Sequence, residues 1–285
     1  MRVNPLQPTA ASTRPGTIQT APRAAAAERD VRPMSDGMTR QRLRSTIAGL
    51  VLGVLAILLQ PSGSCVLQAA TVEPLRVLFI GNSYIYVNDL PSVLADLVRA
   101  SHELRPIETK TIGAPGATLQ AHWEKGEALN ALRQARWDFV VLQEQSVLPT
   151  VDPERMARYA RLFDAEIKKS GAQTILFLTW ARAGKRDMQQ ALDSAYTSLA
   201  KELGSLLAPV GPAWQWALTE NPQLRLHQQD GSHPTSLGTY VAACVFYVVI
   251  YGKLPERSAR RGDAPTSSDA TLAHKAAWDA VKTRK

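Results

Sequence analysis

Residues 75–91, LRVLFIGNSYIYVNDLP, decide the fold class of this chain. The run at 76–80 is rich in β-branched and aromatic residues, which predicts a buried strand. That strand stops at Gly81-Asn82-Ser83, and a helix-like segment follows. Gly and Asn tolerate the backbone angles of tight turns, so a plain turn explains the sequence. A nucleophile held at the end of a strand explains it equally well.

Strand-like and helix-like segments alternate through the rest of the chain. We expect further strands at 107–112, 139–142, 174–179 and 206–210, and helices at 90–103, 119–136, 153–169, 188–203, 235–251 and 272–281. Alternation with short connections predicts an α/β fold, a three-layer α/β/α sandwich around a central parallel sheet of about five strands. In such sheets the functional groups gather beyond the carboxyl ends of the strands, where Ser83 and Gln143 lie.

The first 70 residues differ in composition from the remainder. Residues 1–37 are rich in Ala, Pro, Thr and Arg without apolar periodicity, which is typical of a disordered or misassigned upstream segment. Residues 38–70 contain a basic stretch, the 13-residue apolar run Ile47–Leu59, and then small residues. This pattern predicts a signal peptide, because 13 residues are short for a bilayer span. Residues 71–285 are then the folded domain.

The expected location is therefore periplasmic or secreted. Contact with a membrane is expected only if the N-terminal segment stays uncleaved, as a signal anchor, or if Cys65 carries a lipid. Cys244, the other cysteine, lies in an apolar run and is expected to fill the core.

The net charge of +8 does not indicate a nucleic-acid partner. Residues 1–70 hold eight basic and three acidic residues, which leaves 25 basic against 22 acidic residues in the domain. No basic stripe interleaved with aromatic residues occurs there. The histidines lack metal-ligand spacing, and no phosphate-binding glycine motif follows a strand, so neither a metal nor another cofactor is expected.

A second informative stretch is LHQQDGSHPTSLGTYVAACVF, residues 226–246. A spacing of three in a turn puts Asp230 and His233 on one side of the loop. The carboxylate can then hold Nδ1–H of the imidazole and leave Nε2 free as a base, a task that suits a group with a pKa near 6.5. Taken alone, a turn shaped by Asp230 with a packed histidine is an equally good interpretation.

Together, Gly81-Asn82-Ser83 and Asp230-Gly231-Ser232-His233-Pro234 resemble the two end blocks of the SGNH hydrolases, also called GDSL-type esterases. The resemblance covers roughly residues 75–252. It implies a flavodoxin-like fold, a Ser83 nucleophile, a His233 base and an Asp230 that orients it. It also implies an oxyanion hole formed by the backbone N–H of Ser83, a glycine N–H and a side-chain amide.

The glycine of the oxyanion hole is expected in TIGAPGATLQAHW, residues 111–123, where Gly116 is preferred to Gly113. We expect a glycine because a side chain would block the approach to the reacting oxygen. The third block departs from the family, since the chain has WDFVVLQEQSVLP in place of G-x-N-D. Gln143 or Gln145 is expected to supply the amide. Glu144 is expected either to face solvent or to bind a sugar hydroxyl.

Tyr84 and Trp180 are candidate substrate-binding residues, with packing in the core or at the rim as the alternative. The predicted function is an exported serine esterase acting on a small-molecule or glycan ester, with no cofactor. O-acetyl groups on carbohydrate suit an exported enzyme, while lipid esters, thioesters and other acyl esters stay open. The alternative is a non-catalytic glycan-binding envelope protein that retains the esterase fold.

Overall fold

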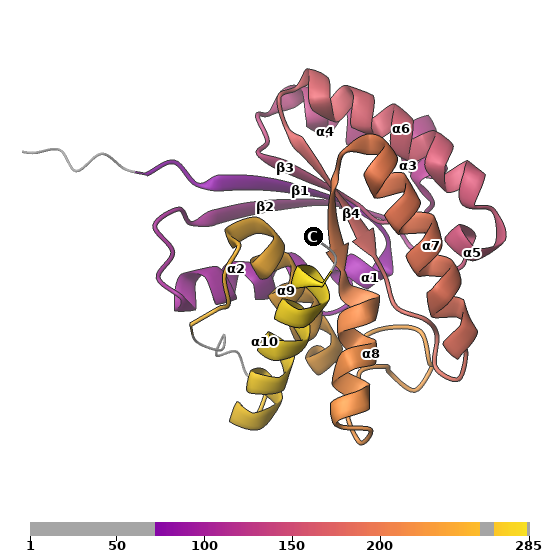
Figure 1. Ribbon diagram of the computed structural model, residues 1–285. Coiled ribbons are helices and arrows are strands. Elements are labelled where there is room, and N and C mark those ends of the chain that lie inside the picture. Colours follow the sequence, from indigo (N-terminus) through magenta and orange to yellow (C-terminus); the bar gives the residue numbers. More distant parts are fainter. Residues whose placement is uncertain (1–71, 257–264, 284–285) are drawn as a thin grey trace, which may run out of the picture. The chain divides into compact units, whose positions relative to one another are not determined.

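A computed structural model describes residues 72–256 and 265–283 of the chain (Figure 1). The predicted disordered segment at 1–37, the signal peptide at 38–70 and Cys65 lie outside the described residues. Within the described part, no helix is both long enough and apolar enough to cross a membrane.

Five parallel strands form one sheet in the order β2-β1-β3-β4-β5. The strands are β1 (Leu75–Gly81), β2 (Ile107–Gly113), β3 (Phe139–Leu142), β4 (Gln173–Leu178) and β5 (Leu206–Pro209). The register pairs Gly81 with Gly113 and Ile80 with Leu142. The segments that follow β1, β2 and β3 therefore leave the same edge of the sheet, beside the point where the strand order reverses.

Helices cover both faces of this sheet (Figure 1). They are α1 (Ser83–Tyr86), α2 (Leu90–Ala100), α3 (Leu119–Lys125), α4 (Glu127–Gln134), α5 (Leu148–Val151), α6 (Pro153–Lys169), α7 (Arg186–Leu203), α8 (Val210–Glu220), α9 (Ser236–Tyr251) and α10 (Ser267–Lys282). The three-layer α/β/α prediction is confirmed.

The alternation of side chains along β1 explains the two apolar cores. Val77 and Phe79 point into a core shared with α2, α8, α9 and α10, whereas Leu78 and Ile80 point into a core shared with α3, α4, α6 and α7. All four side chains are fully buried. A strand covered on both faces needs apolar residues on both, as residues 77–80 of the predicted strand indicated.

Helix α9 is apolar around most of its circumference because sheet and helices surround it. It packs against α2, α8 and α10, and Phe246 meets Phe79 and Phe177 edge to face at 5.6 and 5.0 Å between ring centroids. Cys244 is a free, fully buried thiol in this helix. It fills the core, as the sequence predicted.

Two of the expected elements were wrong in detail. The segment 119–136 is two helices, because Gly126 adopts φ +77° and ends α3 before α4 begins. The final strand stops at Pro209, and α8 follows at once from Val210. Gly211 and Pro212 near its start look like a turn in the sequence, which concealed this helix. The short helices α1 and α5 were also not expected.

Candidate active site

The turn after β1 presents Ser83 at the edge of the sheet. Asn82 caps α1, and its Oδ1 accepts the backbone N–H of Tyr84 at 3.2 Å. Gly81 is required by the close approach of a neighbour, since a Cβ at this position would lie 2.4 Å from Oε1 of Gln143. Ser83 is the first residue of α1 and is half-buried. The glycine and the asparagine thus shape the turn that places Ser83 at the start of α1.

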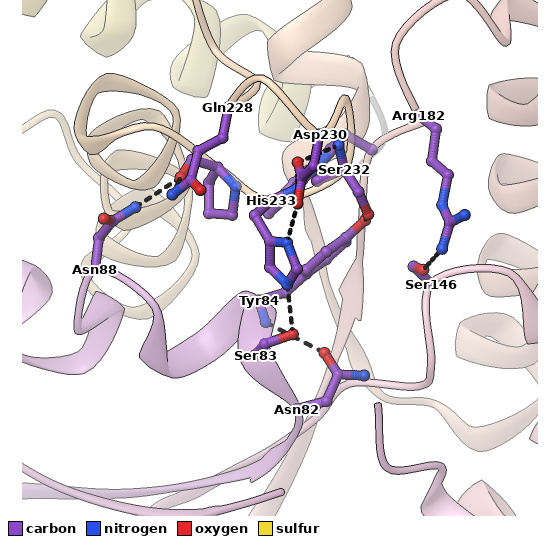
Figure 2. Close-up of polar contacts among 12 residues, drawn as sticks. Asn82, Ser83, Tyr84, Asn88, Ser146, Arg182, Gln228, Asp230, Ser232 and His233 are labelled. Atoms are coloured by element: carbon purple, nitrogen blue, oxygen red, sulfur yellow. Dashed lines mark hydrogen bonds and ion pairs between the residues drawn. The ribbon is translucent and has the colours of Figure 1, made fainter. Parts of the chain in front are cut away.

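The loop before α9 brings Asp230 and His233 to this serine (Figure 2). Oδ1 of Asp230 accepts the backbone N–H groups of Ser232 at 2.9 Å and of His233 at 3.0 Å. Oδ2 of Asp230 bonds Nδ1 of His233, and Nε2 of His233 lies 2.9 Å from Oγ of Ser83. The structure therefore brings together the three residues selected from the sequence, although Ser83 and His233 are 150 positions apart.

Electrostatics favour one protonation pattern for the pair. The hydrogen bond from His233, with help from the N–H of Ser232, lowers the pKa of Asp230 to about 2. An ionised carboxylate can only accept, so Nδ1 of the imidazole carries the proton that faces it. Nε2 of the neutral ring is then an acceptor directed at the hydroxyl of Ser83. A general base needs this arrangement.

Tyr84 and Trp180 were candidate substrate-binding residues with packing in the core or at the rim as the alternative, and their burial favours packing in the core. Their exposed fractions are 4% and 1%. The ring of Trp180 is stacked between Tyr84 and Trp214, at centroid distances of 4.5 and 4.0 Å. The Tyr84 hydroxyl and Oγ of Ser232 share a hydrogen bond of 2.7 Å, and Nε1 of Trp180 donates to the carbonyl of Ser232 at 3.0 Å. Both side chains hold the loop that carries His233.

Gly116 lies in a turn beyond β2, in which the N–H of Ala117 bonds the carbonyl of Ala114 at 3.2 Å. Its φ of +61° calls for glycine, whereas a Cβ there would meet no atom within 4 Å. We expected glycine at position 116 because a side chain would block the approach to the reacting oxygen. The structure gives a different reason, which is the left-handed backbone conformation of the turn. Nδ2 of Asn82 donates to the carbonyl of Ala117 at 3.2 Å and ties this turn to the nucleophile turn.

The two glutamines of the third block differ sharply in their surroundings. Gln143 is fully buried, its Oε1 accepts the N–H of Asn82 at 2.8 Å, and its Nε2 donates to the carbonyl of Glu144. Its amide is thus committed to the backbone beneath the turn. Oε1 of Gln145 accepts the N–H groups of Val147 and Leu148, while its Nε2 has no hydrogen-bond partner among the described residues. Of the two candidates, Gln145 keeps an amide N–H available.

Glu144 neither faces solvent nor is open to a sugar, which corrects both expectations. Only 1% of its surface is exposed, and burial raises the pKa of its carboxyl to about 7 against the lowering effect of two backbone N–H donors. These donors are Gln145 at 2.6 Å and Leu119 at 3.2 Å.

Several supporting residues have no signal in the sequence. Nδ2 of Asn88 donates to the carbonyl of Pro234 at 2.8 Å and to Oγ1 of Thr239 at 2.9 Å, and Gln228 donates to the same carbonyl (Figure 2). Nε2 of the buried His122 lies 2.7 Å from the carbonyl of Gly81. Thr239 lies 151 positions from Asn88 in the chain, and Gly81 lies 41 positions from His122. Only the fold could therefore reveal these contacts.

Solved structures similar to this one were found, although no model of a protein family and no curated protein matches the sequence. A protein from Slackia heliotrinireducens, described as a candidate SGNH hydrolase, is 28% identical with a TM-score of 0.55, over 62% of this chain and 99% of its own. A DUF4886 family protein from Bacteroides uniformis is 19% identical with a TM-score of 0.63, over 74% and 96%.

The acetylxylan esterase Axe2 from Geobacillus stearothermophilus is 20% identical with a TM-score of 0.53, over 66% of this chain and 99% of its own. At identities below 25%, the last two neighbours show a shared fold. The Slackia protein adds sequence similarity to the shared fold.

Proposed function

From its fold and neighbours, which are those of the SGNH/GDSL hydrolase superfamily, we propose that this protein is a serine esterase using Ser83, His233 and Asp230. One observation carries the proposal. The Ser83 hydroxyl lies 2.9 Å from Nε2 of an imidazole whose other nitrogen is held by a carboxylate. This is the arrangement that activates a serine for acyl transfer.

The reaction begins when Oγ of Ser83 attacks the carbonyl carbon of the ester and Nε2 of His233 takes its proton. The tetrahedral intermediate places its negative oxygen at the N–H groups of Ser83 and Gly116 and at the Gln145 amide. The intermediate collapses, the bond to the alcohol oxygen breaks, and His233 returns the proton to that oxygen. Water then attacks the acyl-enzyme with His233 again as base, which releases the acid and restores Ser83. Asp230 stabilises the imidazolium at both stages.

We propose O-acetylated carbohydrate as the substrate class. The support is the fold shared with an acetylxylan esterase and the signal peptide predicted at 38–70, which makes an extracellular polymer accessible. Export itself stays a prediction, because residues 38–70 lie outside the described residues. The mechanism requires no metal or other cofactor.

Labelling with a fluorophosphonate tests the activated serine. We expect one adduct on Ser83, located by peptide mapping, and no adduct in Ser83→Ala. His233→Ala should label far more slowly, and both variants should lose at least about 10⁴-fold in kcat on an acetyl ester. Ser198→Ala, which changes an exposed serine on α7, is the matched control and should behave as wild type.

A folded wild-type protein that takes up no fluorophosphonate would contradict the proposal. That result would favour the alternative of a glycan-binding protein that retains the fold, whose support is the replaced third block. A screen of immobilised glycans with the same protein would then decide the alternative.

A further inference from the structure

Buried polar side chains tie together the three segments that follow β1, β2 and β3. Asn82, after β1, donates its backbone N–H to Oε1 of Gln143 and its Nδ2–H to the carbonyl of Ala117. The carboxyl of Glu144, after β3, accepts the N–H of Leu119 with both oxygens, at 3.2 and 3.3 Å. The segment that contains Gly116 is therefore held at Ala117 by the first loop and at Leu119 by the third.

Glu144 is an unusual choice for this position because a buried carboxylate is costly. An amide would offer one acceptor without the cost of burying a charge. Its carboxyl oxygens instead serve two backbone donors, Leu119 and Gln145, on two different loops. Leu119 opens α3, just after the cap residue Thr118 and three residues beyond Gly116. Of the two third-block glutamines, Gln145 is the one that is partly exposed, and its Nε2 has no hydrogen-bond partner within the described residues, whereas Gln143 is fully buried.

We propose that Glu144 is a positioning residue that sets the oxyanion donors of Gly116 and Gln145 relative to Ser83 through its bonds to the two loops. The inference rests on the proposed esterase function. It assigns a role to the third block, LQEQS, where the chain departs from its family: Gln143 supports the nucleophile turn, Glu144 fixes two loops, and Gln145 supplies the donor.

The role requires an ionised carboxyl. Protonation would turn one of the two acceptor oxygens into a donor and weaken the bonds to Leu119 and Gln145. The titratable and charged groups near the carboxyl are Tyr196 on α7, whose hydroxyl lies 3.4 Å from the backbone nitrogen of Glu144, and Arg155 on α6. Burial keeps the pKa of Tyr196 above its ordinary value, so it stays neutral, and Arg155 favours ionisation of Glu144. With a pKa of about 7, Glu144 changes its charge in the range where esterases are assayed.

The test is steady-state hydrolysis of p-nitrophenyl acetate by wild type, Glu144→Gln and the exposed-site control Glu220→Gln, from about pH 5 to about pH 9. We expect Glu144→Gln to lower kcat about 10- to 100-fold with little change in KM, since the donors are misplaced and not removed. The ratio of wild-type to variant kcat/KM should fall from about 10–100 above about pH 8 towards about 1 below about pH 6, because a protonated Glu144 is uncharged like the amide of Glu144→Gln.

An unchanged kcat in Glu144→Gln, or a wild-type-to-variant ratio of kcat/KM that stays constant over this pH range, would overturn the proposal. Amide hydrogen exchange of the wild-type protein tests the proposal even if the variant does not fold or if the protein hydrolyses no ester. Exchange at Leu119 and Gln145, corrected for the intrinsic pH dependence, should accelerate as Glu144 is protonated between about pH 8 and about pH 5.5. Exchange that is flat over this range contradicts the inference, and it does so independently of whether the esterase function stands.

Discussion

Tyr84 is a single residue that couples the nucleophile turn to the loop of the base. It follows Ser83 directly, yet its hydroxyl bonds Ser232 and its ring lies edge-on to His233 at 5.8 Å between centroids. The ring of Tyr84 is also stacked on the ring of Trp180. Tyr84 therefore fixes the position of the nucleophile turn relative to the loop that carries His233. A precisely spaced Ser–His pair needs this kind of support from neighbouring side chains.

At this scale we predict that Tyr84→Phe keeps the stacking and loses only the hydrogen bond to Ser232. The expected cost is about 1 kcal/mol of unfolding free energy, measured by urea denaturation, with a several-fold loss in kcat. Tyr86→Phe removes an exposed hydroxyl two residues away and should be neutral in both measurements. Equal effects of the two substitutions would contradict the assigned role of Tyr84.

Among the elements, the α3–α4 pair shows where a periodic pattern misleads. Leu129 and Leu132 continue the apolar spacing of the preceding helix, so the segment looks like one helix. Gly126 instead caps α3 by donating its N–H to the carbonyl of His122 at 3.2 Å, and α4 restarts at Glu127. A glycine inside an apolar pattern fits both a tolerated helical residue and a cap, and only the backbone distinguishes them.

The element-scale prediction concerns this cap. Gly126→Ala should destabilise the protein by about 1 kcal/mol through the left-handed backbone alone, because a Cβ at this position meets no atom within 4 Å. For a domain of this size, the melting temperature should fall by about 2–4 °C. Gly126→Asn should lose less, since asparagine tolerates this conformation. If Gly126→Ala were more stable than Gly126→Asn, the left-handed backbone angle would not be the cause of the destabilisation.

The stability of the whole molecule should depend on pH through groups with opposite effects. Burial raises the pKa of Glu144 from its ordinary value of 4.5 to about 7, so the folded state binds the extra proton. Its contribution to stability is complete below about pH 4.5 and is lost as the pH rises through about 7. Burial lowers the pKa of His122 and of His274, whose contributions are lost as the pH falls below the ordinary histidine value of 6.5.

These opposing trends are separated by comparing wild type with Glu144→Gln in urea denaturation across this pH range. The difference in unfolding free energy, wild type minus variant, should decrease as the pH rises from about 5 to about 8, by at most about 3 kcal/mol. Glu220→Gln, which removes an exposed carboxyl on α8, is the control for the loss of a negative charge. A wild-type-minus-Glu144→Gln difference that stays constant would mean that the carboxyl of Glu144 keeps its ordinary pKa in the folded state.

Local patterns were sufficient for much of this molecule. The five strands and the positions of most helices followed from apolar periodicity. The choice of Ser83, Asp230 and His233 followed from the resemblance of two short motifs to those of the SGNH hydrolases. The structure brings these three residues together. Such features are readable because the physical cause, a covered strand or a tight turn, lies within the same few residues.

The tertiary structure alone decided which side chains are free to act. It placed Gln143 beneath the turn and left an amide N–H of Gln145 available, buried Tyr84 and Trp180, and joined Glu144 to Leu119. The partners of these side chains lie up to 148 positions away, as for Tyr84 and Ser232. Burial and hydrogen bonding at such separations are properties of packed loops, and no local pattern encodes them.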